Sequence, residues 1–239
     1  MPIVEKAIVL AAGRGTRMGT LTADLPNPML PVDGRPMLEH ILERLSKAGI
    51  RRVLLVVGYR RETIIEHFAG YEALDIEYAV QETPTGTGSA VALGREFAGS
   101  DPCLLTFGDI ICEPTDYAGL VNMFAECSHG VLGAKHVDDP WQGAAIYEER
   151  GIIQRIVEKP ARGTSSTHWN SAGLYVFAPV LFRYLDRLQM SPRGEYELTS
   201  AIADMIADGQ KLRLYALEGR WRDVGRPEDL QAAADIVDD

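Results

Sequence analysis

Three short apolar runs, separated by stretches with helical spacing, constrain the fold of this 239-residue chain more than any other feature. They occupy residues 7–10, 53–57 and 103–107, and such runs between turn signals are typical of strands buried on both faces. Between the first two runs, apolar residues recur every three or four positions from residue 37 to residue 48. This alternation of strand and helix predicts an α/β fold whose binding site lies at the carboxyl ends of parallel strands.

The pattern changes after Asp109, where strands no longer alternate regularly with helices. The expected helices lie at residues 117–127, 180–188, 196–207 and 227–237, and the expected strands at 131–147, 151–157, 174–177 and 212–217. We therefore predict one domain over residues 1–239, with halves of about 1–110 and 111–239. Its expected fold is a Rossmann-like three-layer sandwich with a mostly parallel central sheet and a small mixed-sheet lobe.

Composition limits the classes of partner. The net charge of −10 argues against a nucleic-acid-binding surface, and no apolar run approaches the length of a membrane span. The N-terminus lacks the pattern of a signal peptide, so a cytoplasmic protein is expected. Cys103, Cys112 and Cys127 lack C-x-x-C spacing, which favours neither a disulfide framework nor a zinc site. The histidines, which show no metal-ligand spacing and are expected to be structural or exposed, are His40, His67, His129, His136 and His168.

The first long loop, residues 10–31, reads LAAGRGTRMGTLTADLPNPMLP. Small residues bring backbone N–H groups close to an anion, and Arg17 offers a guanidinium suited to phosphate oxygens. The loop is not a P-loop, because it has no lysine, and Met18 stands where a dinucleotide fingerprint needs its third glycine. A phosphate-binding loop and an ordinary glycine-rich surface loop both remain open on these residues.

Two further features are ambiguous by themselves. Asp109 follows a buried strand, where a carboxylate either binds a divalent cation or caps a turn. Residues 81–90, QETPTGTGSA, combine the amide of Gln81 with small residues that offer backbone groups to a base, although a plain loop explains them equally simply. Asp223 lies too far along the chain for any argument from spacing.

Together, these segments resemble the sugar-phosphate nucleotidylyltransferase family. Residues 10–17 match its L-A-A-G-x-G-T-R signature, and residues 26–31 match P-K-P-M-x-P except that Asn27 replaces the lysine. Five further motifs of the family follow in the same order. They are a Q-x-x-P-x-G-T-x-x-A segment, a Gly-Asp after a strand, a Glu-Lys-Pro, an asparagine–glycine–tyrosine strand and a W-x-D-V-G. The resemblance covers about residues 7–230. It includes no appended left-handed β-helix or acyltransferase domain, so a stand-alone transferase is expected.

The resemblance implies transfer of a nucleoside monophosphate from a nucleoside triphosphate to a sugar 1-phosphate, with release of pyrophosphate. The implied nucleotide-binding residues are Leu10, Ala11, Ala12, Gly13, Gly15, Thr16, Arg17, Gln81, Gly86, Thr87 and Gly88. The implied sugar-phosphate-binding residues are Gly143, Glu158, Lys159, Asn170 and Gly173. Mg²⁺ is expected on Asp109 and Asp223, with Arg17 on the triphosphate and Lys159 on the attacking phosphate. UTP or dTTP is expected ahead of GTP or CTP, and a homo-oligomer is left open.

Asn27 motivates the alternatives. The chain is either an active transferase, a nucleotide-sugar-binding or regulatory homologue with weak turnover, or a cytidylyltransferase for a phosphorylated alcohol. Intact metal and sugar motifs favour the first. Three explanations for Asn27 in place of the lysine remain open. The chain is a natural member with low activity, another cation such as Arg14 compensates for the lysine, or Asn27 is an introduced substitution.

Overall fold

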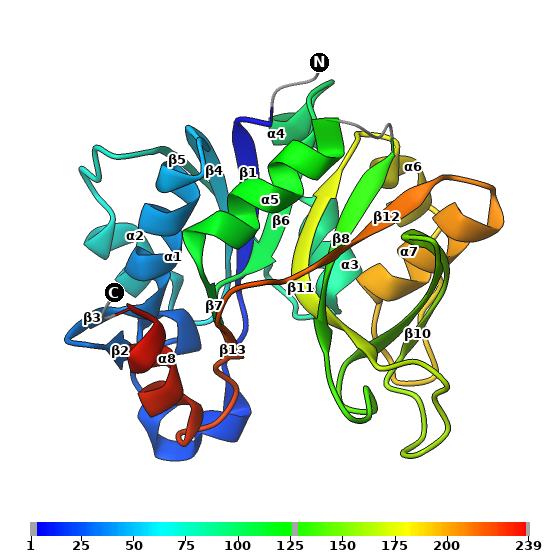
Figure 1. The fold of residues 1–239 in the computed structure, drawn as a ribbon. Helices are drawn as coiled ribbons and strands as arrows, with labels where there is room; N and C mark the ends of the chain where they lie inside the picture. Colours follow the sequence, from blue (N-terminus) through cyan, green and yellow to red (C-terminus); the bar gives the residue numbers. More distant parts are fainter. Residues whose placement is uncertain (1–3, 126–128, 238–239) are drawn as a thin grey trace.

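The computed structural model describes residues 4–125 and 129–237 and contains a nine-stranded sheet in the order β5-β4-β1-β6-β11-β8-β12-β10-β9 (Figure 1). Its strands are β1 (Lys6–Ala11), β4 (Arg52–Val57), β5 (Asp75–Val80), β6 (Cys103–Phe107), β8 (Gly130–His136), β9 (Ala144–Glu149), β10 (Ile152–Glu158), β11 (Trp169–Phe177) and β12 (Leu212–Ala216). Two small sheets pair β2 (Pro31–Val32) with β3 (Arg35–Pro36) and β7 (Ile110–Cys112) with β13 (Trp221–Asp223).

The sheet is mixed rather than mostly parallel. Strands β5, β4, β1 and β6 are parallel, as predicted, but β11 pairs antiparallel with both β6 and β8. Strand β9 also pairs with β11, through Trp169↔Ile146 and Asn170↔Ala145. Strands β11, β8, β12, β10 and β9 therefore close into a small mixed barrel, where the sequence suggested only a mixed-sheet lobe.

Helices cover both faces of the sheet because the buried strands are apolar on both sides. In β1, Ala7 and Val9 pack in one core cluster, whereas Ile8 and Leu10 pack in the other. The first cluster is covered by α1 (Met37–Lys47), α2 (Arg61–His67), α5 (Pro114–Ala125) and α8 (Asp229–Val237). The second is covered by α3 (Thr87–Ala92), α4 (Arg95–Ala98), α6 (Leu181–Leu185) and α7 (Leu198–Ala207). No helix in the described ranges is long and apolar enough to cross a bilayer.

Several predicted boundaries were wrong. The expected strand at 131–147 is two strands, β8 and β9. The sequence of residues 89–97 also predicts one helix, but the structure has two, α3 and α4, with Gly94 between them. A side chain at Gly94 would collide with Ile8, so the close contact with β1 shapes that break. Helix α5 begins at Pro114, earlier than predicted, and Cys127 at its expected end lies outside the described residues.

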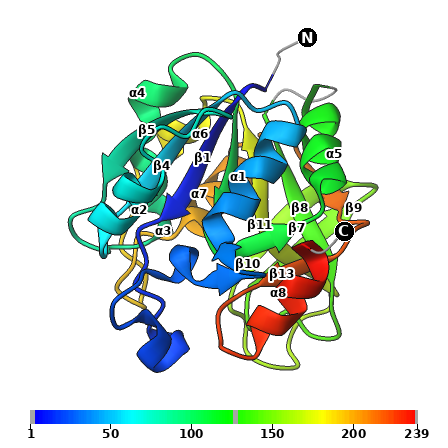
Figure 2. The same ribbon diagram turned by 90° about the vertical axis from the view of Figure 1, so that its left-hand side faces the viewer.

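Strand β13 was not predicted at all, although it shapes the site. It pairs antiparallel with β7, with Trp221 opposite Cys112 and Asp223 opposite Ile110. Figure 2 shows β13 and α8 beside β7, so the end of the chain returns to the strand that follows Asp109.

Candidate active site

The loops after β1 and β6 lie against each other at the carboxyl ends of these parallel strands. The Gly108 N–H donates to the Leu10 carbonyl at 2.8 Å. A Cβ atom at Gly108 would lie 2.9 Å from Pro28 Cγ, so only glycine lets the Pro26–Pro28 turn approach this strand end. The glycine-rich loop, a candidate for phosphate binding, and the Gly108-Asp109 turn, a candidate for metal binding, therefore lie against each other.

Asp109 and Asp223 are brought together by the β7–β13 pairing. The Val224 N–H, next to Asp223, donates to the Asp109 carbonyl at 2.8 Å. Burial raises the pKa of both carboxyl groups, and the neighbouring Asp223 carboxylate raises the pKa of Asp109 further. Because the Asp223 carboxylate disfavours the charged form of Asp109, the two buried carboxyl groups form a centre that would be stabilised by a cation.

Arg17 lies at the edge of this centre. A Cβ atom at Gly225 would lie 2.9 Å from Arg17 Nη2, so the guanidinium rests against the glycine that follows Val224. Its positive charge opposes the rise in the pKa of Asp109 and of Asp223, a rise whose main cause is burial. Arg17 thus faces the same centre as the two aspartates.

Asn27 connects the turn to the centre. It is 4% exposed, and its Nδ2 donates to Asp109 Oδ2 at 3.3 Å and to the Val224 carbonyl at 3.1 Å. Gly15 makes room for it: a Cβ atom there would lie 2.6 Å from Asn27 Cβ, and Gly15 has a left-handed backbone with φ of 70°. Arg14, the cation considered as a substitute for the missing lysine, stacks over the Tyr59 ring at 5.2 Å instead.

The donor set fits a hard divalent cation. Mg²⁺ takes one or two carboxylates and completes its shell with water and phosphate oxygens. The carboxylates of Asp109 and Asp223 supply that minimum, and Asn27 Oδ1 is a buried oxygen with no hydrogen-bond partner among the described residues. Within residues 4–125 and 129–237, no group of three or more His, Cys, Asp or Glu side chains forms a metal cage.

The predicted sugar-phosphate residues gather where β9, β10 and β11 meet. The Lys159 N–H donates to the Gly143 carbonyl at 2.7 Å, and a side chain at Gly143 would collide with the Asn170 amide. Asn170 Oδ1 is buried without a hydrogen-bond partner in the described chain. Lys159 has a left-handed backbone, with φ of 39°, which is uncommon for a side chain of this kind and is found preferentially at functional sites.

The two halves of the site are linked electrostatically. Burial raises the pKa of Asp223, and among the cations that oppose this rise is Lys159. The Lys159 ammonium therefore acts electrostatically on Asp223.

Arg193 is a candidate residue that the sequence reasoning missed. Its Nη1 lies 3.2 Å from Glu158 Oε1 and 3.2 Å from Glu197 Oε1. Burial raises the pKa of Glu158. The signal in the sequence, one arginine in a polar loop, is too weak to single out.

Gly173 has a packing role in this structure. Its φ is 72°, and a side chain there would collide with Ile110 beside Asp109. The register of β11 against β8 shifts between Ser171 and Tyr175, which is the position of this glycine. Its expected contact with a sugar stays a prediction.

Many polar groups of the loop at 81–90 form hydrogen bonds within the loop or with residues 196–198. The Gly88 N–H donates to the Tyr196 carbonyl at 2.7 Å, and Gly86 packs against the same backbone. Gln81 Nε2 donates to the Gly86 carbonyl at 3.0 Å, and Thr87 Oγ1 accepts the Leu198 N–H at 3.0 Å. These contacts shape the loop, while its binding of a base stays a prediction.

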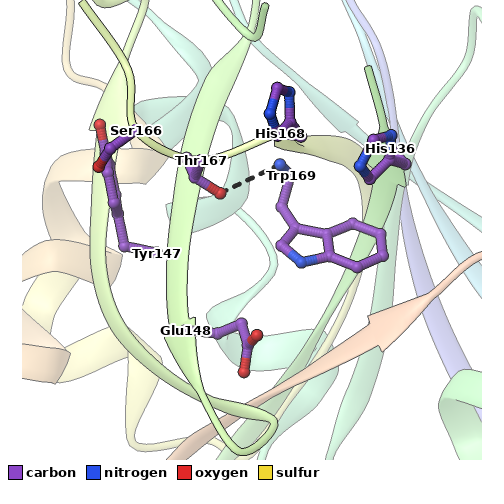
Figure 3. A pocket seen from close by; sticks show the side chains of 7 residues that line it. All are labelled: His136, Tyr147, Glu148, Ser166, Thr167, His168 and Trp169. Atoms are coloured by element: carbon purple, nitrogen blue, oxygen red, sulfur yellow. Dashed lines mark hydrogen bonds between the residues drawn. The ribbon is translucent and has the colours of Figure 1, made fainter. Parts of the chain in front are cut away.

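A separate pocket of about 420 Å³ lies on the barrel (Figure 3). It is lined by His136, Tyr147, Glu148, Ser166, Thr167, His168 and Trp169. The rings of His136 and His168 stack 5.2 Å apart. Trp169 precedes Asn170 on β11, and neighbouring strand residues point to opposite faces, so this pocket is not the site around Asn170.

Known proteins resemble the chain over nearly its whole length. The nucleotidyl transferase family profile matches residues 6–239. Agl11 of Haloferax volcanii, a low-salt glycan biosynthesis nucleotidyltransferase, is 31% identical over 97% of this chain and 66% of its own length. AglF of the same organism, a UTP–glucose-1-phosphate uridylyltransferase, is 33% identical over 95% of this chain and 94% of its own length. The bifunctional protein GlmU of Methanococcus maripaludis is 36% identical, and the chain spans only 53% of it.

Two solved structures share the fold. A UDP-glucose pyrophosphorylase complexed with UDP-glucose superposes with a TM-score of 0.88 at 21% identity, covering 98% of both chains. A candidate glucose-1-phosphate thymidylyltransferase from Bacillus anthracis, in complex with a sucrose, also gives 0.88 at 26% identity, covering 98% of this chain and 95% of that one.

Proposed function

The chain belongs to the nucleotidyl transferase family, and we propose that it transfers a nucleoside monophosphate from a nucleoside triphosphate to a sugar 1-phosphate. The observation that carries the proposal is the pairing of β7 with β13, which joins two aspartates from distant parts of the sequence beside Arg17 and Lys159. We further propose that the chain acts as one transferase domain, with the nucleotide held by about residues 1–110 and the sugar phosphate by about residues 111–239.

The proposed reaction needs no general base. A phosphate monoester has a second pKa near ~6, so it is largely dianionic at neutral pH and is already a nucleophile. Lys159 holds this attacking phosphate, and Arg17 holds the triphosphate. The protein contributes alignment of the two phosphates and positive charge around the group that is transferred.

Asp109 and Asp223 are the proposed Mg²⁺ ligands. When bound, the cation neutralises charge on the triphosphate and its pyrophosphate leaving group. The raised pKa of both carboxyl groups supports this assignment, because a divalent cation relieves the burial and repulsion that cause it. Asn27 in place of a lysine supports slower turnover than in relatives that carry the lysine.

The sugar-phosphate pocket is proposed to include Gly143, Glu158, Asn170 and Gly173, with Arg193 as an additional cation. The unpartnered Asn170 Oδ1 supports a ligand here, because a buried oxygen without a hydrogen bond is costly unless a substrate hydroxyl satisfies it. Names of relatives make UTP the first nucleotide to test.

The deciding experiment is a grid of UTP, dTTP, GTP, CTP and ATP against common sugar 1-phosphates, with pyrophosphate release measured. We expect release for at least one pair, dependent on Mg²⁺ and abolished in Asp223→Asn. Binding of a nucleotide sugar without release in any pair would favour the binding or regulatory alternative. A phosphorylated alcohol such as choline phosphate is included as a further acceptor, and release with it alone would favour cytidylyl transfer.

A further inference from the structure

Asp116 is a buried carboxylate that the proposed reaction does not use. It lies in the first turn of α5 and has no exposed surface. Its Oδ1 accepts the Glu218 N–H at 3.0 Å, and its Oδ2 accepts the Gly219 N–H at 3.1 Å. Tyr215 Oη donates to Oδ1 at 3.4 Å. Because a buried carboxylate is costly unless it is well paired, both oxygens must keep these donors.

The segment that Asp116 holds leads directly to Asp223. It joins β12 of the barrel to β13, and Gly219 lies four residues before Asp223. Lys135 Nζ donates to the Gly219 carbonyl at 3.2 Å. The chain then enters β13, where Asp223 pairs with Ile110. The contacts of Asp116 and Lys135 therefore fix the chain just before β13, the strand that carries Asp223.

The same helix turn is also connected to Asp109. Strand β7 follows Asp109, and α5 begins two residues after β7 ends at Cys112. A Cβ atom at Gly219 would lie 2.9 Å from Asp116 Oδ2, so the two segments are packed as closely as glycine allows. The first turn of α5 thus follows Asp109 closely along the chain. Through the hydrogen bonds of Asp116, the same turn also holds the segment that leads to Asp223.

We propose that Asp116 is a positioning residue that sets the separation of Asp109 and Asp223 and so tunes the affinity for the divalent cation. This inference rests on the proposed cation centre. Residues that orient metal ligands from behind typically change metal affinity by about 10–100-fold when they are replaced. Asp116→Asn keeps the shape of the side chain but turns an amide N–H₂ toward a backbone N–H, which pushes the 218–219 segment away.

The test is a titration of the full chain with Mn²⁺, followed by the electron paramagnetic resonance signal of the free ion. We expect the dissociation constant for Mn²⁺ to rise by about 10-fold or more in Asp116→Asn. Gly219→Ala should change it in the same direction, because its Cβ would crowd the start of α5, at 2.5 Å from Glu113 Cγ and 2.9 Å from Asp116 Oδ2. Phe124→Leu is the matched control, because Phe124 is buried on the same helix but in its last turn, whereas Asp116 lies in the first.

The outcomes separate the inference from the proposed function. If Asp223→Asn loses Mn²⁺ binding while Asp116→Asn and Gly219→Ala behave like Phe124→Leu, the positioning role is wrong and the cation centre stands. If Asp223→Asn binds Mn²⁺ as the unchanged protein does, or if the unchanged protein binds none, the centre is wrong and the role of Asp116 falls with it. Thermal unfolding shows whether Asp116→Asn is folded. If it is not, the Mn²⁺ affinity of Gly219→Ala decides whether the positioning role holds.

Discussion

Replacing Asn27 by lysine should accelerate turnover. The Asn27 amide lies 3.3 Å from Asp109 Oδ2 and is almost fully buried, so it occupies a position next to the proposed cation centre without bringing charge. A lysine at this position would bring an ammonium toward the proposed phosphate site, in a region partly removed from water. The substitution adds a second positive charge to the loop, beside that of Arg17.

The expected size follows from two opposing contributions. Unit charges about 4 Å apart interact by about 4 kcal/mol at an effective dielectric constant of about 20. The substitution also removes the two hydrogen bonds of Asn27, which contribute about 1 kcal/mol each. The difference of about 2 kcal/mol corresponds to about 30-fold in kcat.

The assay compares steady-state pyrophosphate release by the unchanged protein, Asn27→Lys and Asn27→Met. Methionine approaches the length of lysine without its charge, so Asn27→Met should not exceed the unchanged protein. KM for the nucleotide should change much less than kcat, because Arg17 and the glycine-rich loop are retained. Equal kcat/KM values for the unchanged protein and Asn27→Lys would refute a catalytic part for position 27, and an equal gain in Asn27→Met would refute the electrostatic reasoning.

Three other predictions test the same site. Asp109→Asn and Asp223→Asn should each reduce turnover at saturating Mg²⁺ by about two orders of magnitude or more, and near-normal turnover in either would exclude that aspartate as a ligand. Lys159→Ala should raise KM for the sugar phosphate more than KM for the nucleotide, whereas the opposite pattern would reassign Lys159 to the nucleotide. Gly15→Ala should destabilise the protein by at least about 1–2 kcal/mol in denaturant unfolding, because alanine is strained at φ of 70° and its Cβ would crowd Asn27. Gly13→Ala is its control, since a Cβ there meets nothing within 4 Å, and equal losses in both variants would contradict this account.

Local patterns in the sequence were sufficient for the parallel strands and the first helix of the fold. Residues 53–57 were predicted as a strand covered on both faces, and β4 (Arg52–Val57) is buried between β1 and β5. The helical spacing over residues 37–48, which lies between Pro36 and Gly49 in the sequence, corresponds to α1 (Met37–Lys47). These elements are predictable because their signals, apolar runs and helix-ending residues, are contained within the element itself.

The second half depended on contacts between distant residues. Nothing local in residues 144–149 indicates that β9 pairs with β11 as well as β10, yet that pairing turns a lobe into a closed barrel. In the first half, the break between α3 and α4 places Gly94 against Ile8, a residue of β1 far away in the sequence. Such features arise from packing, so the pattern of one segment cannot reveal them.

The sequence by itself determined which chemical groups the proposed site contains. The glycine-rich loop, Arg17, Asp109, Lys159 and Asp223 were identified from motifs, because the types and local spacing of residues are properties of the linear chain. Only the tertiary structure decided that Asp223 lies beside Asp109, that Asn27 donates to both of their segments, and that Asp116 holds the approach to β13. Those relations depend on the antiparallel pairing of β7 with β13 and on hydrogen bonds between segments about a hundred residues apart, whose geometry exists only once the sheet has assembled.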